Sequence, residues 1–196
     1  MAPKSESEPG SARLDQLWRR GRELLGVRYA ILGGAMSWLS ERHLVAAISN
    51  AGGFGVIACG AMTPDLLEAE IKATAERTDK PFGVNLITMH PEIEDLMTVC
   101  VACGVGHVVL AGGLPRTADI ERLKQAGIRV LGFAPALAVA RRLVRAGIDG
   151  IKDYQQQADF VSRVRLVNTH LCKRLLPCPS RKIEFSHPIP PTNNPP

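Results

Sequence analysis

The sequence has few aromatic residues and lacks several features that would assign it to a class. Phe, Trp and Tyr make up 5% of its 196 residues, so a core must be built from Ala, Val, Ile and Leu, as in layered α/β proteins. No run approaches the roughly 18 consecutive apolar residues of a membrane-spanning helix, and the first residues are polar and partly acidic. We therefore expect a globular protein of the cytoplasm that does not bind membranes.

Cysteine is too sparse and too irregularly placed for a disulfide framework. The five cysteines are an odd number and lie in apolar or basic surroundings. Cys100 and Cys103 form a CxxC pair, but a zinc site would need a second ligand pair, and none lies at a suitable spacing. The pair follows a helical pattern, which favours two small side chains on a buried helix face. We predict no metal site.

Glycine is absent after Gly150, and this absence divides the chain. All 18 glycines precede that point or lie at it, whereas half of the 14 prolines lie in the last twenty residues. Most of the net charge of +5 also belongs to the end of the chain, where residues 152–196 carry seven basic and three acidic side chains. We predict a polar N-terminal segment over residues 1–16, a folded region over 17–151, and a basic, proline-rich, irregular tail over 152–196.

Before Gly150 the chain repeats one kind of unit: a short apolar run, a turn marked by Gly, Pro or Asn, and a helical pattern that ends at glycine. Each run is apolar on both faces, which is typical of strands buried in a parallel sheet. The predicted strands are Tyr29–Leu32, Gly55–Cys59, Phe82–Leu86, His107–Leu110, Arg129–Phe133 and Gly147–Ile151.

Helix start and stop signals separate these strands. The start signals are Thr63-Pro64, His90-Pro91, Thr117 and Pro135, and the stop signals include Gly127 and Gly147. Five to six βα units result, with about 20 to 30 residues in each. Periodicity alone does not distinguish a doubly wound open sheet from a (β/α)₈ barrel, and a full barrel needs roughly 250 residues.

The stretch AISNAGGFGVIACG, residues 47–60, has three glycines close together before and within its apolar run, and it invites comparison with a phosphate-binding loop. A dinucleotide fingerprint requires strand, glycines and helix in that order, so that the pyrophosphate meets a helix N-terminus. Here the glycines precede the strand. We predict that Gly52 and Gly53 end a helix in a left-handed turn and that Gly55 lets the chain pack closely as the strand begins.

Four motifs in order resemble the nitronate monooxygenase family, formerly the 2-nitropropane dioxygenases, which is related to the flavin-dependent enoyl-acyl-carrier-protein reductases. They are YAILGGAMSWLSERHLVAAISNAGGFGVIACGAMTP, TDKPFGVNLITMHP, GVGHVVLAGG and AGIRVLGFAPALAVARRLVRAGIDG, and they cover roughly residues 17–150. The resemblance implies an α/β fold of TIM (β/α)₈ type. This chain would form an incomplete barrel of five to six βα units, truncated or altered at its C-terminal end.

The resemblance also implies a non-covalent FMN at the C-terminal ends of the strands. The family's Gly-Gly-Met-x-Trp loop corresponds to residues 34–38, with alanine in place of the second glycine. Small residues suit this position because a flat ring stacks only where the backbone approaches closely. An asparagine after the third strand suits the ring edge, because its amide both donates and accepts hydrogen bonds. The predicted cofactor-binding residues are Gly34, Ala35, Met36, Ser37 and Asn85.

Two departures from the family pattern limit what is transferred. Phe133 stands where some members carry a lysine, which leaves the substrate open. After Gly150 the family continues into E-G-x-E-A-G-G-H, whose histidine takes the α-proton of a nitroalkane, and into loops that bind the FMN phosphate. Neither is present here, and His170 and His187 do not match the family position. We therefore predict no catalytic residue.

Three functional hypotheses follow. The first is an FMN-dependent oxidoreductase that takes a small nitronate or nitroalkane and O₂ and yields a carbonyl compound and nitrite. The second is a catalytically inactive barrel remnant or interaction module that self-associates through an open barrel edge. The third is an anionic-surface binder acting through the basic tail, but interleaved aromatic residues are lacking, so nucleic-acid binding is not expected. The tail itself fits either a basic binding segment or a replaced, out-of-frame C-terminus.

Overall fold

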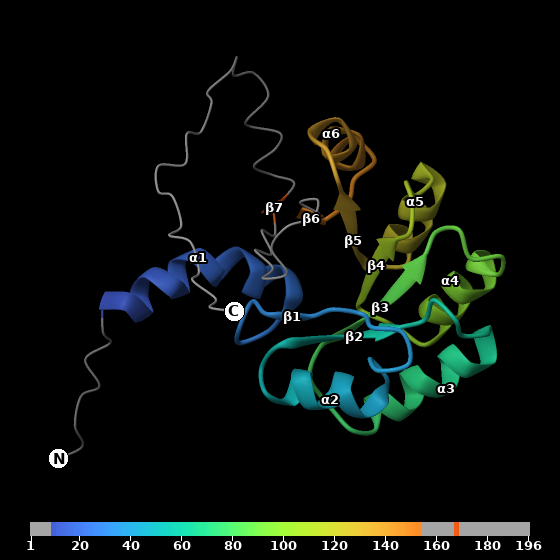
Figure 1. Cartoon of the computed structure of the whole chain (residues 1–196), viewed down its shortest axis with the longest axis horizontal. Coiled ribbons are helices and arrows are strands. Elements are labelled where there is room, and N and C mark those ends of the chain that lie inside the picture. Colours follow the sequence, from blue (N-terminus) through green and yellow to red (C-terminus); the bar gives the residue numbers. More distant parts are fainter. Residues whose placement is uncertain (1–8, 154–166, 169–196) are drawn as a thin grey trace, which may run out of the picture.

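The structure is a computed structural model that describes residues 9–153 and 167–168. Helices and strands alternate through nearly all of this part of the chain (Figure 1). The helices are α1 (Pro9–Leu25), α2 (Arg42–Asn50), α3 (Pro64–Ala75), α4 (Ile93–Ala102), α5 (Thr117–Gln125) and α6 (Leu137–Arg145). The strands are β1 (Leu32–Gly33), β2 (Phe54–Ala58), β3 (Phe82–Ile87), β4 (His107–Ala111), β5 (Arg129–Ala134), β6 (Gly150–Asp153) and β7 (Val167–Asn168).

The strands form one sheet in their sequence order. Strands β1 to β6 pair in parallel, each with the next, and β7 pairs antiparallel with the first two residues of β6. A doubly wound sheet reverses its strand order at a switch point, and no reversal occurs here. The prediction of an α/β fold with an incomplete (β/α)₈-type barrel is confirmed, with five complete βα units and a sixth strand.

Helices α2 to α6 follow one another along the outer side of the curved sheet, and α1 lies apart from that layer (Figure 1). Alternate strand residues such as Val84, Leu86 and Leu110 pack against these helices in one continuous buried cluster. A strand presents successive side chains to opposite faces. The residues between them, including Asn85 and Val109, therefore face the inside of the partial barrel.

Helix α1 ends against the N-terminal ends of the strands. Leu25 is fully buried in a small inner cluster with Phe54, Val56, Val109 and Leu131. This helix starts at Pro9 and runs across the domain boundary predicted at residue 17. None of the helices in the described part of the chain has the length and apolar character needed to cross a membrane.

The predicted bounds were most accurate in the middle of the sheet and wrong at its two ends. The first strand was predicted at Tyr29–Leu32 but is Leu32–Gly33, because Tyr29 donates its amide to the Gly52 carbonyl and the chain turns there. The last parallel strand was predicted at Gly147–Ile151 but begins at Gly150, because Gly147 has φ +88° and completes the turn after α6.

Helix starts follow the sequence signals in part. Thr63 caps α3, since its hydroxyl accepts the Leu66 amide at 3.4 Å. Thr117 was predicted as a cap but is the first residue of α5, and Arg116 precedes it with its guanidinium bonded to Asp119. His90 Nδ1 accepts the Glu92 amide at 3.1 Å, so α4 begins at Ile93, beyond His90-Pro91.

Gly52 and Gly53 lie between α2 and β2, as predicted, and Gly55 is the second residue of β2. Gly52 has φ +90°, which few other residues adopt, while Gly53 is not left-handed. A Cβ on Gly55 would lie 2.4 Å from the Val45 carbonyl oxygen, so α2 and β2 approach each other only with glycine there. The stretch is a helix stop that leads into β2, and it is not a phosphate loop.

The cysteine pair lies on α4 and at its end. Cys100 is fully buried in the outer cluster and Cys103 is half-buried at the C-cap. In residues 9–153 no group of three or more His, Cys, Asp or Glu side chains is placed to hold a metal ion.

Candidate functional site

Four of the five predicted cofactor-binding residues lie in the loop between β1 and α2. This loop follows the C-terminal end of its strand, where binding sites of parallel barrels are built. Gly34 is half-buried, and Ala35, Met36 and Ser37 are exposed. A Cβ on Gly34 would meet nothing within 4 Å, so the loop leaves open space beside its backbone.

The fifth predicted residue, Asn85, lies on β3 and faces the inside of the sheet. Its neighbours Val84 and Leu86 point outward into the helix-facing cluster, which fixes the direction of Asn85 by strand alternation. Asn85 is 8% exposed, and its side-chain amide has no hydrogen-bond partner within the described ranges. The buried side-chain atoms without a partner in the described residues are Thr88 Oγ1 and His107 Nδ1, so the Asn85 amide keeps some contact with solvent. It is therefore accessible to a ligand.

Strand β2 connects the loop with Asn85. Ala58 is paired in register with Asn85. The Ala58 amide also donates to the carbonyl of Ser40, which lies at the end of the β1–α2 loop, at 3.0 Å. The next amide, of Cys59, donates to the Asn85 carbonyl at 3.4 Å. The structure thus brings all five predicted residues to the C-terminal edge of β1 to β3, although no hydrogen bond among the described residues joins Asn85 to residues 34–37 directly.

Asn85 is in register with Ala58 on one side and with Val109 on the other, and small residues lie at the ends of these strands. Ala58 and Ala111 end β2 and β4, and Gly60 follows β2. A Cβ on Gly60 would lie 3.1 Å from Ile87, and one on Gly112 would lie 2.7 Å from the same side chain. Ile87 therefore fills the space that larger residues would take. Asn85 thus lies among the apolar side chains of Ala58, Val109 and Ile87, a setting that suits a flat apolar ligand with hydrogen-bonding edges.

Exposed apolar side chains lie in the loops at this edge and at the first residue of α6. We call this group the apolar rim. It consists of Met36, Trp38, Leu39, Met89, Leu114 and Leu137. Trp38 is 72% exposed and has φ +63°, the left-handed region that non-glycine residues seldom occupy. Such strained residues concentrate at functional sites.

Sequence reasoning missed Ser40, which shapes the predicted loop. Its hydroxyl donates to the Gly34 carbonyl and accepts the Met36 amide, both at 3.0 Å, and the residue is 3% exposed. In the sequence this serine precedes a helix and resembles a cap. The cap is instead Glu41, whose carboxylate accepts the His43 and Leu44 amides.

Phe133 lies near the end of β5 and packs against the inner cluster. Its side chain makes this part of the strand edge apolar. Cys59 follows β2, but burial raises the pKa of its thiol to about 12, which keeps it protonated and unreactive at neutral pH. His170 and His187 lie outside the described residues.

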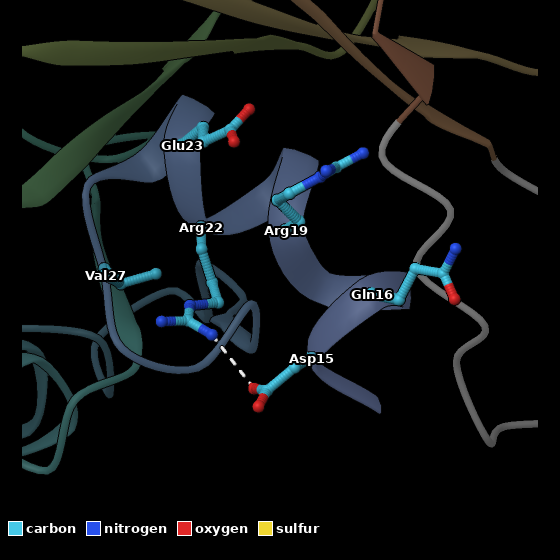
Figure 2. Close-up of a pocket in the computed structure, with 6 residues that line it drawn as sticks. All are labelled: Asp15, Gln16, Arg19, Arg22, Glu23 and Val27. Carbon is cyan, nitrogen blue, oxygen red and sulfur yellow. Dashed lines mark hydrogen bonds and ion pairs between the residues drawn. The ribbon is translucent and has the colours of Figure 1, made fainter. Parts of the chain in front are cut away.

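A second concavity lies along α1 and is separate from the predicted site. Its lining comes from α1 and the turn that follows it, as Figure 2 shows: Asp15, Gln16, Arg19, Arg22, Glu23 and Val27. Arg22 and Asp15 form an ion pair of 3.0 Å across it. Both partners are substantially exposed, so we assign the concavity no role in binding the predicted cofactor.

Comparison with known proteins identifies the family. The family model described as nitronate monooxygenase matches residues 19–152, which is more than half of the chain. A carboxyl-CoA dehydrogenase of Mycobacterium tuberculosis, named for a 5-hydroxy-7a-methyl-1-oxo-octahydro-1H-indene substrate, is 35% identical over 129 residues, covering 66% of this chain and 36% of the enzyme. A nitronate monooxygenase of Paraburkholderia phytofirmans is 30% identical over 166 residues, covering 65% and 45%.

A solved structure supports the same assignment. FabK from Thermotoga maritima superposes with a TM-score of 0.65 and 41% identity, covering 67% of this chain and 42% of that one. The chain spans less than half the length of the curated relatives it matches. Because the family model, the sequence relatives and the fold agree, the chain belongs to the nitronate monooxygenase family, which is a family of enzymes.

Proposed function

We propose that the chain provides the ring-contact half of an FMN-dependent oxidoreductase that oxidises alkyl nitronates with O₂ to a carbonyl compound and nitrite. The observation that carries this proposal is the unpartnered, inward-facing amide of Asn85 beside the β1–α2 loop. It lies at the strand edge where barrel enzymes bind their ligands. FMN, when bound, would supply the electron-accepting chemistry that no side chain of this site offers.

The residues at this edge have distinct roles in the proposal. The Asn85 amide would meet alternating carbonyl and N–H groups at the ring edge, since it can both donate and accept. Gly34, Ala35, Met36 and Ser37 would contact the ring through backbone and small side chains. Ala58 and Ala111 form the floor beneath, where larger side chains would exclude a flat ligand.

Nitronate is favoured over neutral nitroalkane as the substrate class. A nitronate has already lost its α-proton, so it needs no general base. No residue of the predicted site is a histidine, and the Cys59 thiol is held protonated by burial, with its pKa raised to about 12. Phe133 adds an apolar wall suited to the alkyl part of a small substrate.

A second candidate function is an interaction module without catalysis. The apolar rim is the observation that favours it, because exposed apolar groups gathered at one edge are typical of protein interfaces. Strand β1 also has no neighbour on its outer side in the described sheet, whereas β6 carries β7. In this alternative a second copy of the chain would cover the rim or the β1 edge.

The experiment that tests both is flavin titration of the purified chain, combined with its oligomeric state. We expect a visible flavin spectrum at one FMN per chain and nitrite release from an added alkyl nitronate. A chain that leaves FMN free and elutes as a defined dimer would overturn the oxidoreductase and support the module. Loss of FMN in an Asn85→Leu variant would assign the binding to the proposed site.

A further inference from the structure

We propose that Ser40 is the positioning residue of the FMN-contact loop, by which we mean residues 34–37. Its hydroxyl fixes the backbone conformation of this loop beside the strand edge that carries Asn85. The inference rests on the proposed function, because that function assigns these residues to the flavin. It adds a residue that does not itself contact the ligand. Ser40 acts through the backbone groups that it bonds.

The hydroxyl of Ser40 ties together two backbone groups of the loop. It donates to the Gly34 carbonyl and accepts the Met36 amide, both at 3.0 Å. Ser40 is 3% exposed, whereas the side chains of Ala35 and Met36 are exposed. One buried hydroxyl therefore closes a turn whose outer part faces solvent, and water competes poorly for a buried partner.

The Ser40 backbone reinforces the same turn. Its amide donates to the Met36 carbonyl at 2.9 Å, and the Leu39 amide reaches the same oxygen at 3.1 Å. Trp38, which lies in the turn between Met36 and these two donors, has φ +63°. A tryptophan holds that conformation only where its surroundings determine it. The two hydrogen bonds that the Leu39 and Ser40 amides donate to the Met36 carbonyl provide that constraint, together with the Ser40 hydroxyl.

Ser40 also joins the loop to the rigid part of the fold. Its carbonyl accepts the Ala58 amide at 3.0 Å, and Ala58 is in register with Asn85. Two residues further on, Arg42 donates both its backbone amide and its guanidinium to Glu70 of α3. The loop is thus attached to β2 on one side and to the α2–α3 pair on the other, and Ser40 is the point where these attachments meet.

Ser49, near the C-terminal end of α2, offers a matched control. Its hydroxyl also donates to a carbonyl, that of Pro81 at 3.0 Å, and accepts an amide, that of Gly55 at 3.3 Å. Ser49 is fully buried, as Ser40 nearly is. It lies at the opposite end of β2, away from residues 34–37. Replacing either serine by alanine removes the same chemistry from different places.

The first test needs no flavin. Amide hydrogen exchange, resolved by residue with NMR, is measured on the full chain and on the Ser40→Ala, Ser40→Thr and Ser49→Ala variants. We expect Ser40→Ala to speed exchange of the Met36 amide by about tenfold, which is the effect of losing one typical hydrogen bond. Ser40→Thr keeps a hydroxyl and should restore protection, and Ser49→Ala should leave the Met36 amide unchanged.

The second test measures FMN affinity of the same variants, with thermal unfolding as a measure of general stability. Ser40→Ala should weaken FMN binding by about tenfold. Ser49→Ala should bind FMN as the wild type does despite a comparable fall in unfolding temperature. If Ser40 served only the stability of the fold, FMN affinity would fall in both variants in proportion to the loss of unfolding temperature.

The outcomes separate this inference from the proposed function. Unchanged Met36 exchange in Ser40→Ala, or equal flavin losses in Ser40→Ala and Ser49→Ala, would overturn the role of Ser40. A wild-type chain that binds no FMN, but whose Met36 amide loses protection in Ser40→Ala, would support Ser40 as the determinant of the loop and overturn the flavin assignment instead.

Discussion

The two ends of the partial barrel are built in opposite ways. At the N-terminal ends of the strands, α1 inserts the fully buried Leu25, and the side chains of His107 and Arg129 bond the Leu24 carbonyl at 2.9 and 2.5 Å. At the C-terminal ends, Asn85 is buried without a partner and Trp38 is strained and exposed. The first end is covered by α1, although His107 Nδ1 is buried there without a partner, and we call it the closed end. The second leaves polar and apolar groups accessible to a ligand, and we call it the open end.

This difference teaches where stability and binding reside in the chain. Barrel enzymes place their sites at the C-terminal face, and the opposite face contributes to stability. Substitutions at the closed end should therefore change the free energy of unfolding, while those at the open end should change affinity. The largest expected effect is the loss of a buried side chain at the closed end, and the smallest is the protonation of one histidine.

The largest effect is expected from Leu25→Ala at the closed end. Truncating a fully buried leucine removes apolar contacts and leaves a cavity, so the free energy of unfolding should fall by about 2–5 kcal/mol. Chemical denaturation of the apoprotein measures it. Leu17→Ala is the control, since Leu17 lies on the same helix but is 69% exposed. Equal losses in both variants would show that α1 does not close this end.

Gly55→Ala should have the next largest effect. The added Cβ would lie 2.4 Å from the Val45 carbonyl oxygen and 2.9 Å from the Val45 Cα, so α2 must move away from β2. Overpacking of this kind costs about 1–3 kcal/mol. Gly106→Ala is the matched control, because a Cβ there meets nothing within 4 Å. Thermal unfolding of the two variants decides whether this contact sets the helix position.

These two positions also show what could be predicted from sequence. Gly55 belongs to the AISNAGGFGVIACG stretch, and its close packing follows from glycine at the start of an apolar strand. Leu25 gave no such signal, because α1 is polar over most of its length and its contacts lie far along the chain. The bond from His107 to Leu24 spans 83 residues, a separation that local patterns do not encode.

The candidate site divides in the same way. Asn85 was predicted at the end of the third strand and is the fourth of the six residues of β3, because the strand continues to Ile87. The strand itself was predicted from its apolar run. That its amide lacks a partner depends on every neighbouring strand. Ser40 was missed because its hydroxyl bonds backward into the loop, at Gly34 and Met36, rather than forward into the helix as a capping serine would.

Asn85→Leu should separate stability from binding at the open end. Leucine fills a similar volume without a polar group to satisfy, so the apoprotein should gain about 1 kcal/mol while FMN binding is lost. Denaturation and flavin titration measure the two effects. Asn50→Leu is the control, since the Asn50 amide bonds the Arg77 carbonyl at 3.0 Å and accepts Thr78 at 2.6 Å, and its loss should lower stability.

The smallest effect concerns the protonation of His107 at the closed end. Burial, aided by the nearby charge of Arg129, lowers the pKa of His107 below its ordinary value of 6.5, against the opposing effects of the Leu24 carbonyl and Asp149. Below pH 6.5 the unfolded chain therefore takes up a proton that the folded chain does not, and stability should fall as the pH decreases from 6.5 towards the lowered pKa.

His107→Gln tests this directly, because its amide can still donate to Leu24 but does not titrate. Between pH 7.5 and 5.5 the variant should lose less stability than the wild type in urea unfolding. The carboxylate of Glu70 does not interfere in this range: burial would raise its pKa, but hydrogen bonds from Arg42 hold the pKa below its ordinary 4.5. Parallel pH profiles in the two proteins would show that burial does not lower the pKa of His107 in the folded chain and would contradict this prediction.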